Sequence, residues 1–104
     1  MRRGEVWWAN LPPPTGRRPV VLLSRNRAYQ IRTAVTVVAV TRTIRGIPTE
    51  VPIGPQDGMP QDCVINADDI LTIPKSLLDE RITTLPPEKL STLATAVKFA
   101  LDLP

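Results

Sequence analysis

Two short segments hold the residues whose chemistry is most informative. Arg17 and Arg18 stand just before one apolar run, while Thr41 and Arg42 end another, with Arg45 three residues further on. A guanidinium grips a phosphate through two parallel hydrogen bonds and keeps its charge at any ordinary pH. A threonine hydroxyl can donate to a phosphate oxygen or orient a ribose hydroxyl. Together these residues predict phosphate chemistry if the fold brings the two segments together.

The elements that must position these residues are the apolar runs at 19–24 and 34–41. If they form antiparallel neighbouring strands, the start of one lies beside the end of the other. Arg18 and Thr41 would then be close in space. Plainer roles stay open: an arginine in this position often forms a surface ion pair, and a threonine that ends a strand often satisfies a backbone group.

The chain has no histidine and one cysteine, Cys63. The absence of histidine excludes Ser-His-Asp, Cys-His and two-histidine ribonuclease chemistry. A lone cysteine forms neither an internal disulfide nor a multi-cysteine zinc site, so Cys63 is predicted to be a buried filler. We expect no metal and no cofactor, and the sequence singles out no general base. RNA carries its own nucleophile in the ribose 2′-hydroxyl, so such a site could break RNA but not DNA.

Charge is distributed unevenly along the 104 residues. Residues 1–50 hold nine arginines against Glu5 and Glu50, a balance of +7, whereas residues 51–104 hold four basic against eight acidic residues, a balance of −4. The basic half suits a phosphate-bearing polymer. Arginine that serves only as a solubilising residue would explain the same asymmetry.

The length of the chain predicts one domain over residues 1–104. No apolar run approaches the roughly 18 residues of a membrane span, and the polar start does not resemble a signal peptide. A cytoplasmic protein with no membrane contact is therefore expected.

The hydrophobic pattern predicts a mainly β fold with a C-terminal helix. β-Branched and apolar runs, bounded by proline and glycine turns, predict strands at 5–10, 19–24, 34–41, 49–53, 63–66, 69–73 and 81–85, with a helical turn at 74–78. The third of these runs is the most β-prone and is expected to be central. The segment 49–53 is expected at a sheet edge. Such short strands predict a small SH3-like β-barrel.

Proline pairs and leucine spacing predict the final helix from residue 86 onward. Its apolar stripe is expected to pack on the barrel, with a partner as the alternative. Trp7 and Trp8 are adjacent on the first strand, so one should face the core and the other outward. The outward ring could stack on a base or fill a subunit interface.

The order of these pieces resembles the MazF/PemK family of toxin endoribonucleases over essentially the whole chain. The resemblance is carried by six segments: Arg3–Trp8, Arg17–Ser24, Val37–Thr41, Pro48–Ile53, Val64–Ile70 with Thr72–Lys75, and the closing helix. Each motif is moderately specific, and their order and spacing together are strong.

The resemblance implies that Arg18 and Thr41 are catalytic. It implies a homodimer that cuts single-stranded RNA at short sequences without metal, leaving a 2′,3′-cyclic phosphate. It also implies a cognate acidic antitoxin, similar to MazE, as the inhibitory partner. The further residues expected to bind RNA are Arg17, Arg42, Arg45, Ser24 and Arg25.

One segment departs from the family pattern. The first loop, 11–17, is shorter than in most members and contains no acidic residue. Two other functions remain as alternatives. A gyrase poison of the related CcdB group relies on a C-terminal aromatic residue, whereas this chain ends Leu101-Asp102-Leu103-Pro104. A barrel that only binds nucleic acid would need the basic half but not Thr41.

Overall fold

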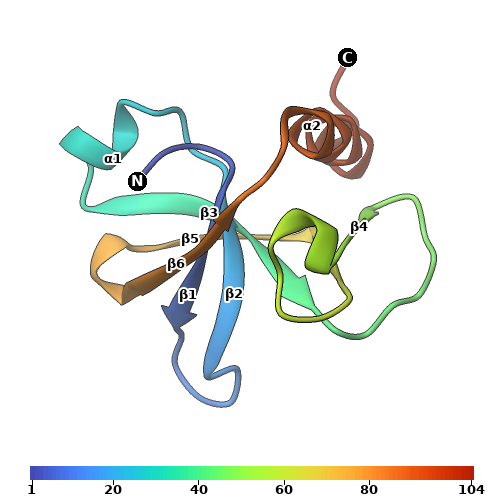
Figure 1. Cartoon of the computed structure of the whole chain (residues 1–104). Helices are drawn as coiled ribbons and strands as arrows, with labels where there is room; N and C mark the ends of the chain where they lie inside the picture. Colours follow the sequence, from blue (N-terminus) through green and yellow to red (C-terminus); the bar gives the residue numbers. More distant parts are fainter.

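The computed structural model describes all 104 residues and contains one bent antiparallel sheet with a long C-terminal helix (Figure 1). The main elements are β1 (Glu5–Asn10), β2 (Arg17–Leu22), α1 (Ala28–Ile31), β3 (Ala34–Thr41), β4 (Glu50–Ile53), β5 (Cys63–Pro74), β6 (Leu78–Thr84) and α2 (Pro87–Leu101). Two single 3-10 turns, η1 (Pro55–Asp57) and η2 (Lys75–Leu77), complete the chain. The predicted fold class, mainly β with a C-terminal helix, is confirmed.

The strand order of the sheet is β4-β5-β3-β2-β1-β6. β3 is therefore internal and β4 lies at an edge, as the sequence predicts. β2 and β3 are antiparallel, with Val20 opposite Ala39 and Val21 opposite Val38. Arg18 and Thr41 each lie two residues beyond the last of these pairs, at the same end of the two strands. The antiparallel pairing therefore brings the start of β2 and the end of β3 to one end of the sheet.

Two hydrophobic clusters explain why the central strands are so rich in valine. Along β3, Val38 and Val40 contribute to the larger cluster, while Val35 and Val37 contribute to the smaller one. Successive side chains of a strand point to opposite faces, so both faces of β3 are buried. The strand that ends in Thr41 is consequently held from both sides.

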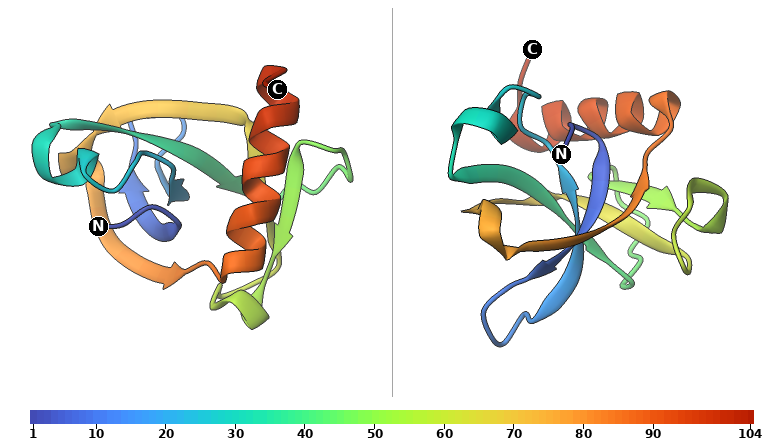
Figure 2. Two further views of the ribbon diagram at one scale, coloured as in Figure 1. Left: turned by 90° about the horizontal axis from the view of Figure 1, so that it is seen from above. Right: turned by 60° about the vertical axis from the view of Figure 1, so that its left-hand side comes forward.

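The long helix α2 packs beside β4 and β5 (Figure 2). Leu93 is fully buried and belongs to the larger cluster, so the apolar stripe does pack on the sheet. Lys89 anchors the start of the helix: its Nζ donates to the carbonyl of Pro52 at 2.6 Å and lies 3.9 Å from the buried carboxylate of Asp57. Neither α1 nor α2 combines the length and the apolar composition that a membrane-spanning helix requires.

The sequence prediction differs from the structure in the fifth strand. Residues 63–66 and 69–73 were expected to be separate strands, but β5 is continuous from Cys63 to Pro74. Its pairing with β3 shifts between Val38 and Val40, where the partner changes from Ile70 to Ile65. A bulge of this kind bends a strand without ending it. The polar residues that suggested a break mark the bend.

A short helix, α1, connects β2 to β3 and was not predicted. Tyr29 is its buried anchor, and its hydroxyl donates to the carbonyl of Ser24 at 3.0 Å. Burial raises the pKa of Tyr29 to about 12, so the hydroxyl stays protonated and keeps donating. The surrounding residues, mostly polar, carry no helical period that could have revealed this single turn.

Candidate active site

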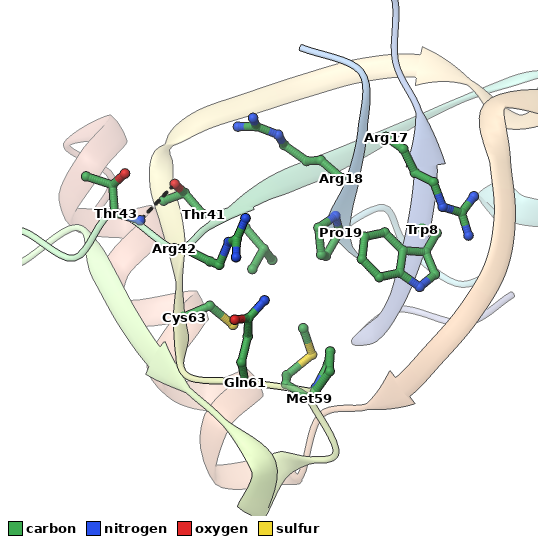
Figure 3. Close-up of a pocket in the computed structure, with 12 residues that line it drawn as sticks. Trp8, Arg17, Arg18, Pro19, Thr41, Arg42, Thr43, Met59, Gln61 and Cys63 are labelled. Carbon is green, nitrogen blue, oxygen red and sulfur yellow. Dashed lines mark hydrogen bonds between the residues drawn. The ribbon is translucent and has the colours of Figure 1, made fainter.

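A cavity of about 420 Å³ opens where β2 begins and β3 ends (Figure 3). Its wall combines residues from β1, β2, β3, the loop after β3, the loop between β4 and β5, and the start of β5. The lining residues are Trp8, Arg17, Arg18, Pro19, Val40, Thr41, Arg42, Thr43, Met59, Pro60, Gln61 and Cys63. Three arginines and no acidic residue line this cavity, so the site is suited to an anion.

Arg18 and Thr41 both line the cavity and both are half-buried. The Thr41 Oγ1 accepts a hydrogen bond from the Thr43 backbone N–H at 3.2 Å, which leaves its own proton free to donate. Arg18 forms no ion pair within the protein. The two predicted catalytic residues therefore reach one site, with a guanidinium and a hydroxyl both available to a ligand.

Arg17 also borders the cavity, but its side chain is engaged elsewhere. Its guanidinium forms an ion pair with Asp79, donates to Asn10 Oδ1 at 3.2 Å, and lies 5.0 Å from the centre of the Trp8 ring. The Glu80 carboxylate is a further 3.8 Å neighbour. Figure 3 shows this side chain directed away from Arg18. The positive charge of Arg17 is thus largely offset by β6.

The other residues predicted to bind RNA divide into two groups. Arg42 lines the cavity, and Arg45 lies nearby in the exposed loop that follows β3, where its backbone N–H donates to Glu50 Oε1 at 2.9 Å. Ser24 and Arg25 follow β2 at its opposite end. The Ser24 Oγ accepts from the Thr36 N–H at 2.8 Å, which gives it a structural role. The structure does not bring Ser24 and Arg25 to the cavity.

Four further lining residues were not predicted. Met59, Pro60 and Gln61 come from the loop between β4 and β5, and Thr43 from the loop after β3. These residues are neither charged nor aromatic, so the sequence alone gives no indication that they contact nucleic acid. The pairing of β3 with β5 brings this part of the wall to the site, because Thr41 lies opposite Val64, the neighbour of Cys63.

Cys63 is buried in the cavity wall and its thiol is free. Burial raises the pKa of this thiol, and the negative charges of Asp62 and Asp57 raise it further. A raised pKa keeps the sulfur protonated at neutral pH, where a thiol is a poor nucleophile. The environment supports the prediction of a filler.

The two tryptophans have different surroundings, as adjacent positions on a strand require. Trp7 packs against the smaller hydrophobic cluster, and its indole N–H donates to Glu5 Oε1 at 2.9 Å. Trp8 belongs to neither cluster and lines the cavity instead. The outward-facing ring is thus Trp8, and it lies at the candidate site.

Comparison with known proteins identifies the class to which this fold and site belong. A family model described as "PemK-like, MazF-like toxin of type II toxin-antitoxin system" matches residues 2–101. The chain is 44% identical over 91 residues to a probable endoribonuclease MazF2 of Mycobacterium tuberculosis, which covers 86% of this chain and 87% of that protein. The chain therefore belongs to the MazF/PemK family of type II toxin endoribonucleases.

Solved structures agree with this assignment. The Mycobacterium tuberculosis toxin MazF-mt6 superimposes with a TM-score of 0.88 at 35% identity, over 96% of this chain and 98% of that one. A mycobacterial endoribonuclease solved in complex with its cognate antitoxin gives the same TM-score at 33% identity, over 100% of this chain and 97% of that one. The fold is the MazF fold, and the protein is a MazF-type endoribonuclease.

Proposed function

We propose that this toxin cuts single-stranded RNA by internal transesterification in the cavity lined by Arg18 and Thr41. The products would be a 2′,3′-cyclic phosphate and a 5′-hydroxyl. One observation carries the proposal: a half-buried guanidinium and a half-buried hydroxyl line the same cavity, and both are free for a ligand. The endoribonucleases among its relatives support the substrate class.

Each group in the cavity has a role that follows from its chemistry. Arg18 holds the scissile phosphate by two parallel hydrogen bonds and stabilises the extra negative charge of the pentacoordinate transition state. Thr41 donates to a phosphate oxygen or orients the ribose hydroxyl, and Arg42 adds positive charge. The 2′-oxygen bonds to phosphorus as the bond from phosphorus to the 5′-oxygen breaks. The 2′-hydroxyl loses a proton and the 5′-oxygen gains one.

The proposed reaction needs no metal ion. Guanidinium groups supply fixed positive charge where a transferring phosphoryl group would otherwise require a cation. The proposal also includes selectivity for short sequences, since the cavity wall is cationic near Arg18 and apolar near Met59 and Pro60. The cationic part of the wall would bind a phosphate of the RNA, and the apolar part would contact a base.

The test is cleavage of a long single-stranded RNA in the presence of excess chelator. We expect discrete cuts whose 5′-hydroxyl ends accept a labelled phosphate without prior dephosphorylation. Removing one transition-state donor costs about 100-fold or more in rate. Arg18→Ala should therefore abolish detectable cleavage, and Thr41→Val, which keeps the branched shape, should reduce it strongly.

Matched controls separate these effects from lost stability. Arg32→Ala and Thr95→Ala remove the same groups from exposed positions outside the cavity, and both should cleave like the parent. A 2′-deoxy nucleotide at a mapped cut site should block that cut. Continued cleavage there would contradict the proposed nucleophile, and RNA that is bound but uncut would favour a binding barrel.

We also propose a homodimer that an acidic antitoxin segment inhibits. The solved complex of a similar endoribonuclease with its cognate antitoxin supports the partner class. A carboxylate-rich segment would be attracted to Arg18 and Arg42, which form no ion pair within the chain. An acidic peptide that competes with RNA, and loses that effect in Arg42→Ala, would support this partner.

A further inference from the structure

We propose that the cavity contains a nucleobase site beside the phosphate site, in which Trp8 stacks on one base and Gln61 reads its edge. This inference rests on the proposed function and deepens it, because it assigns the residues that select the sequence. It concerns the side chains of the cavity that the phosphate chemistry leaves unused.

The position of Trp8 in the cavity wall makes its ring accessible to a ligand. It is half-buried, belongs to neither hydrophobic cluster, and lines the cavity. Its indole N–H donates to no group in the protein, whereas that of Trp7 is bonded to Glu5. The Trp8 ring does not pack in the core, and its indole N–H has no acceptor in the protein. The ring is therefore free to stack on a base, a contact that all four bases can make.

Arg17 holds this ring in position without competing for the phosphate. Its guanidinium lies against Trp8 and is itself fixed by Asp79 and Asn10. In Figure 3 the Arg17 guanidinium lies between Trp8 and strand β6, beside the ring rather than toward Arg18. A preformed stacking surface lowers the ordering cost of binding. Arg17 is therefore a positioning residue.

Gln61 supplies the recognition group. It is exposed, forms no hydrogen bond in the structure, and its amide extends into the cavity (Figure 3). A neutral amide offers one acceptor and two donors side by side, which matches the edge of a base rather than a phosphate. Its chain neighbours Met59 and Pro60 are apolar, and Figure 3 shows the amide directed toward Arg42, a cation suited to a phosphate, so the amide is the neutral polar group that can distinguish one base from another.

The arrangement fits the way proteins read single-stranded RNA. Unpaired bases are typically stacked on aromatic rings and hydrogen-bonded along their edges, while cations hold the backbone. Here the cations Arg18 and Arg42 and the ring of Trp8 line one cavity of about 420 Å³. That volume lies within the roughly 300–1,000 Å³ typical of small-ligand sites. A nucleotide could contact both parts at once.

Stacking is tested by fluorescence, independently of cleavage. In Trp7→Phe the sole remaining indole is Trp8. This variant is titrated with a random 2′-deoxy oligonucleotide pool containing deoxyuridine, and with an abasic oligonucleotide of equal length. Stacking contributes about 1–3 kcal/mol per base, so the pool should quench Trp8 and bind at least about fivefold more tightly than the abasic chain. Equal affinity and no base-dependent quenching would overturn the stacking.

A second pair of variants keeps the test independent of how well Trp7→Phe folds. Trp8→Phe retains an aromatic face and should keep the preference for bases over the abasic chain. Trp8→Leu retains apolar bulk without a stacking face and should lose that preference. If Trp8→Leu keeps it, Trp8 contributes only packing and the proposal is wrong.

Edge reading is tested with Gln61→Glu, whose carboxylate accepts but cannot donate. A carboxylate matches the adjacent N1–H and N2–H donors of guanine, so the preference at one nucleotide position should move toward guanine by roughly tenfold relative to uracil. Gln56→Glu adds the same charge in the same loop outside the cavity and should leave the preference unchanged. An unchanged preference in Gln61→Glu would overturn the assignment.

The preference is measured twice, by mapping the 5′ ends of cleaved RNA and by sequencing the oligonucleotides that bind. If the parent protein does not cut RNA, the proposed function fails, and the bound pool still decides on the base site. If the protein cuts RNA, but neither preference changes in Gln61→Glu and bases add no affinity over the abasic chain, the base-site proposal is wrong while the proposed function stands.

Discussion

At the scale of single residues, the surroundings of Cys63 lower the nucleophilicity of its thiol. Its pKa is raised by burial and by Asp62 and Asp57, so the thiolate fraction at neutral pH is lower than in a free cysteine. We expect iodoacetamide to modify the folded protein far more slowly than the urea-unfolded chain. Cys63→Ala should cleave RNA at nearly the parent rate. Rapid alkylation of the native state coupled to loss of cleavage would show instead that this sulfur takes part in the reaction.

The sequence predicted Arg18 and Thr41 from their residue types at the ends of strongly β-patterned runs and from the family resemblance, and the structure places both in the lining of one cavity. The engagement of Arg17 with Asp79 was not predictable, since 62 residues separate the pair along the chain. Gln61 and Met59 were missed for the same reason. Side chains in a loop reach a cavity only through the three-dimensional path of that loop, which local patterns do not encode.

At the scale of elements, the start of β1 depends on the carboxylate of Glu5. Burial alone would raise the pKa of Glu5, but hydrogen bonds from Trp7 and the Arg2 N–H, together with nearby positive charge that includes Arg81, lower it overall. A carboxyl group with a lowered pKa stabilises the fold above its unfolded-state pKa, and that contribution is lost as the pH falls through the folded-state value.

Glu5→Gln should therefore destabilise the protein at neutral pH by about 1.5–3 kcal/mol, the range for a hydrogen bond to a charged group. The difference from the parent should vanish at a pH below the folded-state pKa, where the parent carboxyl is also neutral. Urea unfolding at the two pH values measures both effects. Asp69→Asn, an exposed acid without a partner, provides the control. A deficit that persists unchanged in acid would mean that shape, not charge, matters at this position.

The turn that leads from η1 toward β5 requires glycine at position 58. Gly58 has a φ of +88°, and a Cβ there would overlap the side chain of Thr83 on β6. Gly46 has a φ of +71° but faces open space. A left-handed conformation costs about 1–2 kcal/mol for a residue with a Cβ, so Gly46→Ala should lose about that much stability.

Gly58→Ala should lose clearly more stability than Gly46→Ala, because the overlap with Thr83 adds to the same backbone cost. The midpoints of urea unfolding for the two variants give the comparison. Adding Thr83→Ala to Gly58→Ala removes the overlap with Oγ1 but leaves the Thr83 Cβ 2.8 Å away and loses the hydrogen bond from Oγ1 to the Asp57 carbonyl, so it should recover only a small part of the loss. If the two glycine variants were equally stable, the close packing of this loop against β6 would be disproved.

The element boundaries also show what a local pattern can and cannot predict. Strands β1 and β3 occupy the residues expected from their β-branched and aromatic runs. The continuity of β5 was missed because the polar residues at its bend look like a turn, while the pairing partners on β4 and β3 hold it extended. Helix α1 was missed because a single turn is stabilised by the burial of Tyr29 rather than by helical periodicity.

At the scale of the whole molecule, the arginine-rich half of the sequence does not form one basic surface. The antiparallel pairing of β2 and β3 sends Arg18 and Arg42 to the cavity end, while Arg25 and Arg32 lie at the opposite end, next to α1. Residues 1–50 carry a net charge of +7, but the directions of β2 and β3 place these arginines at two opposite ends of the sheet. A short RNA bound in the cavity can therefore contact only some of them.

This division predicts how the affinity for RNA depends on salt. Each phosphate that a protein neutralises on a single strand contributes about −0.7 to the slope of log K against log salt concentration. For a short uncleavable 2′-deoxy oligonucleotide, Arg18→Ala and Arg42→Ala should each reduce the magnitude of that slope by about 0.7. Arg25→Ala and Arg32→Ala should leave it unchanged, because their side chains lie beyond the reach of a chain that fills the cavity. Fluorescence anisotropy over a series of KCl concentrations gives the slopes. An equal reduction in Arg25→Ala would mean that the bound strand runs from the cavity to α1, along the whole length of β2.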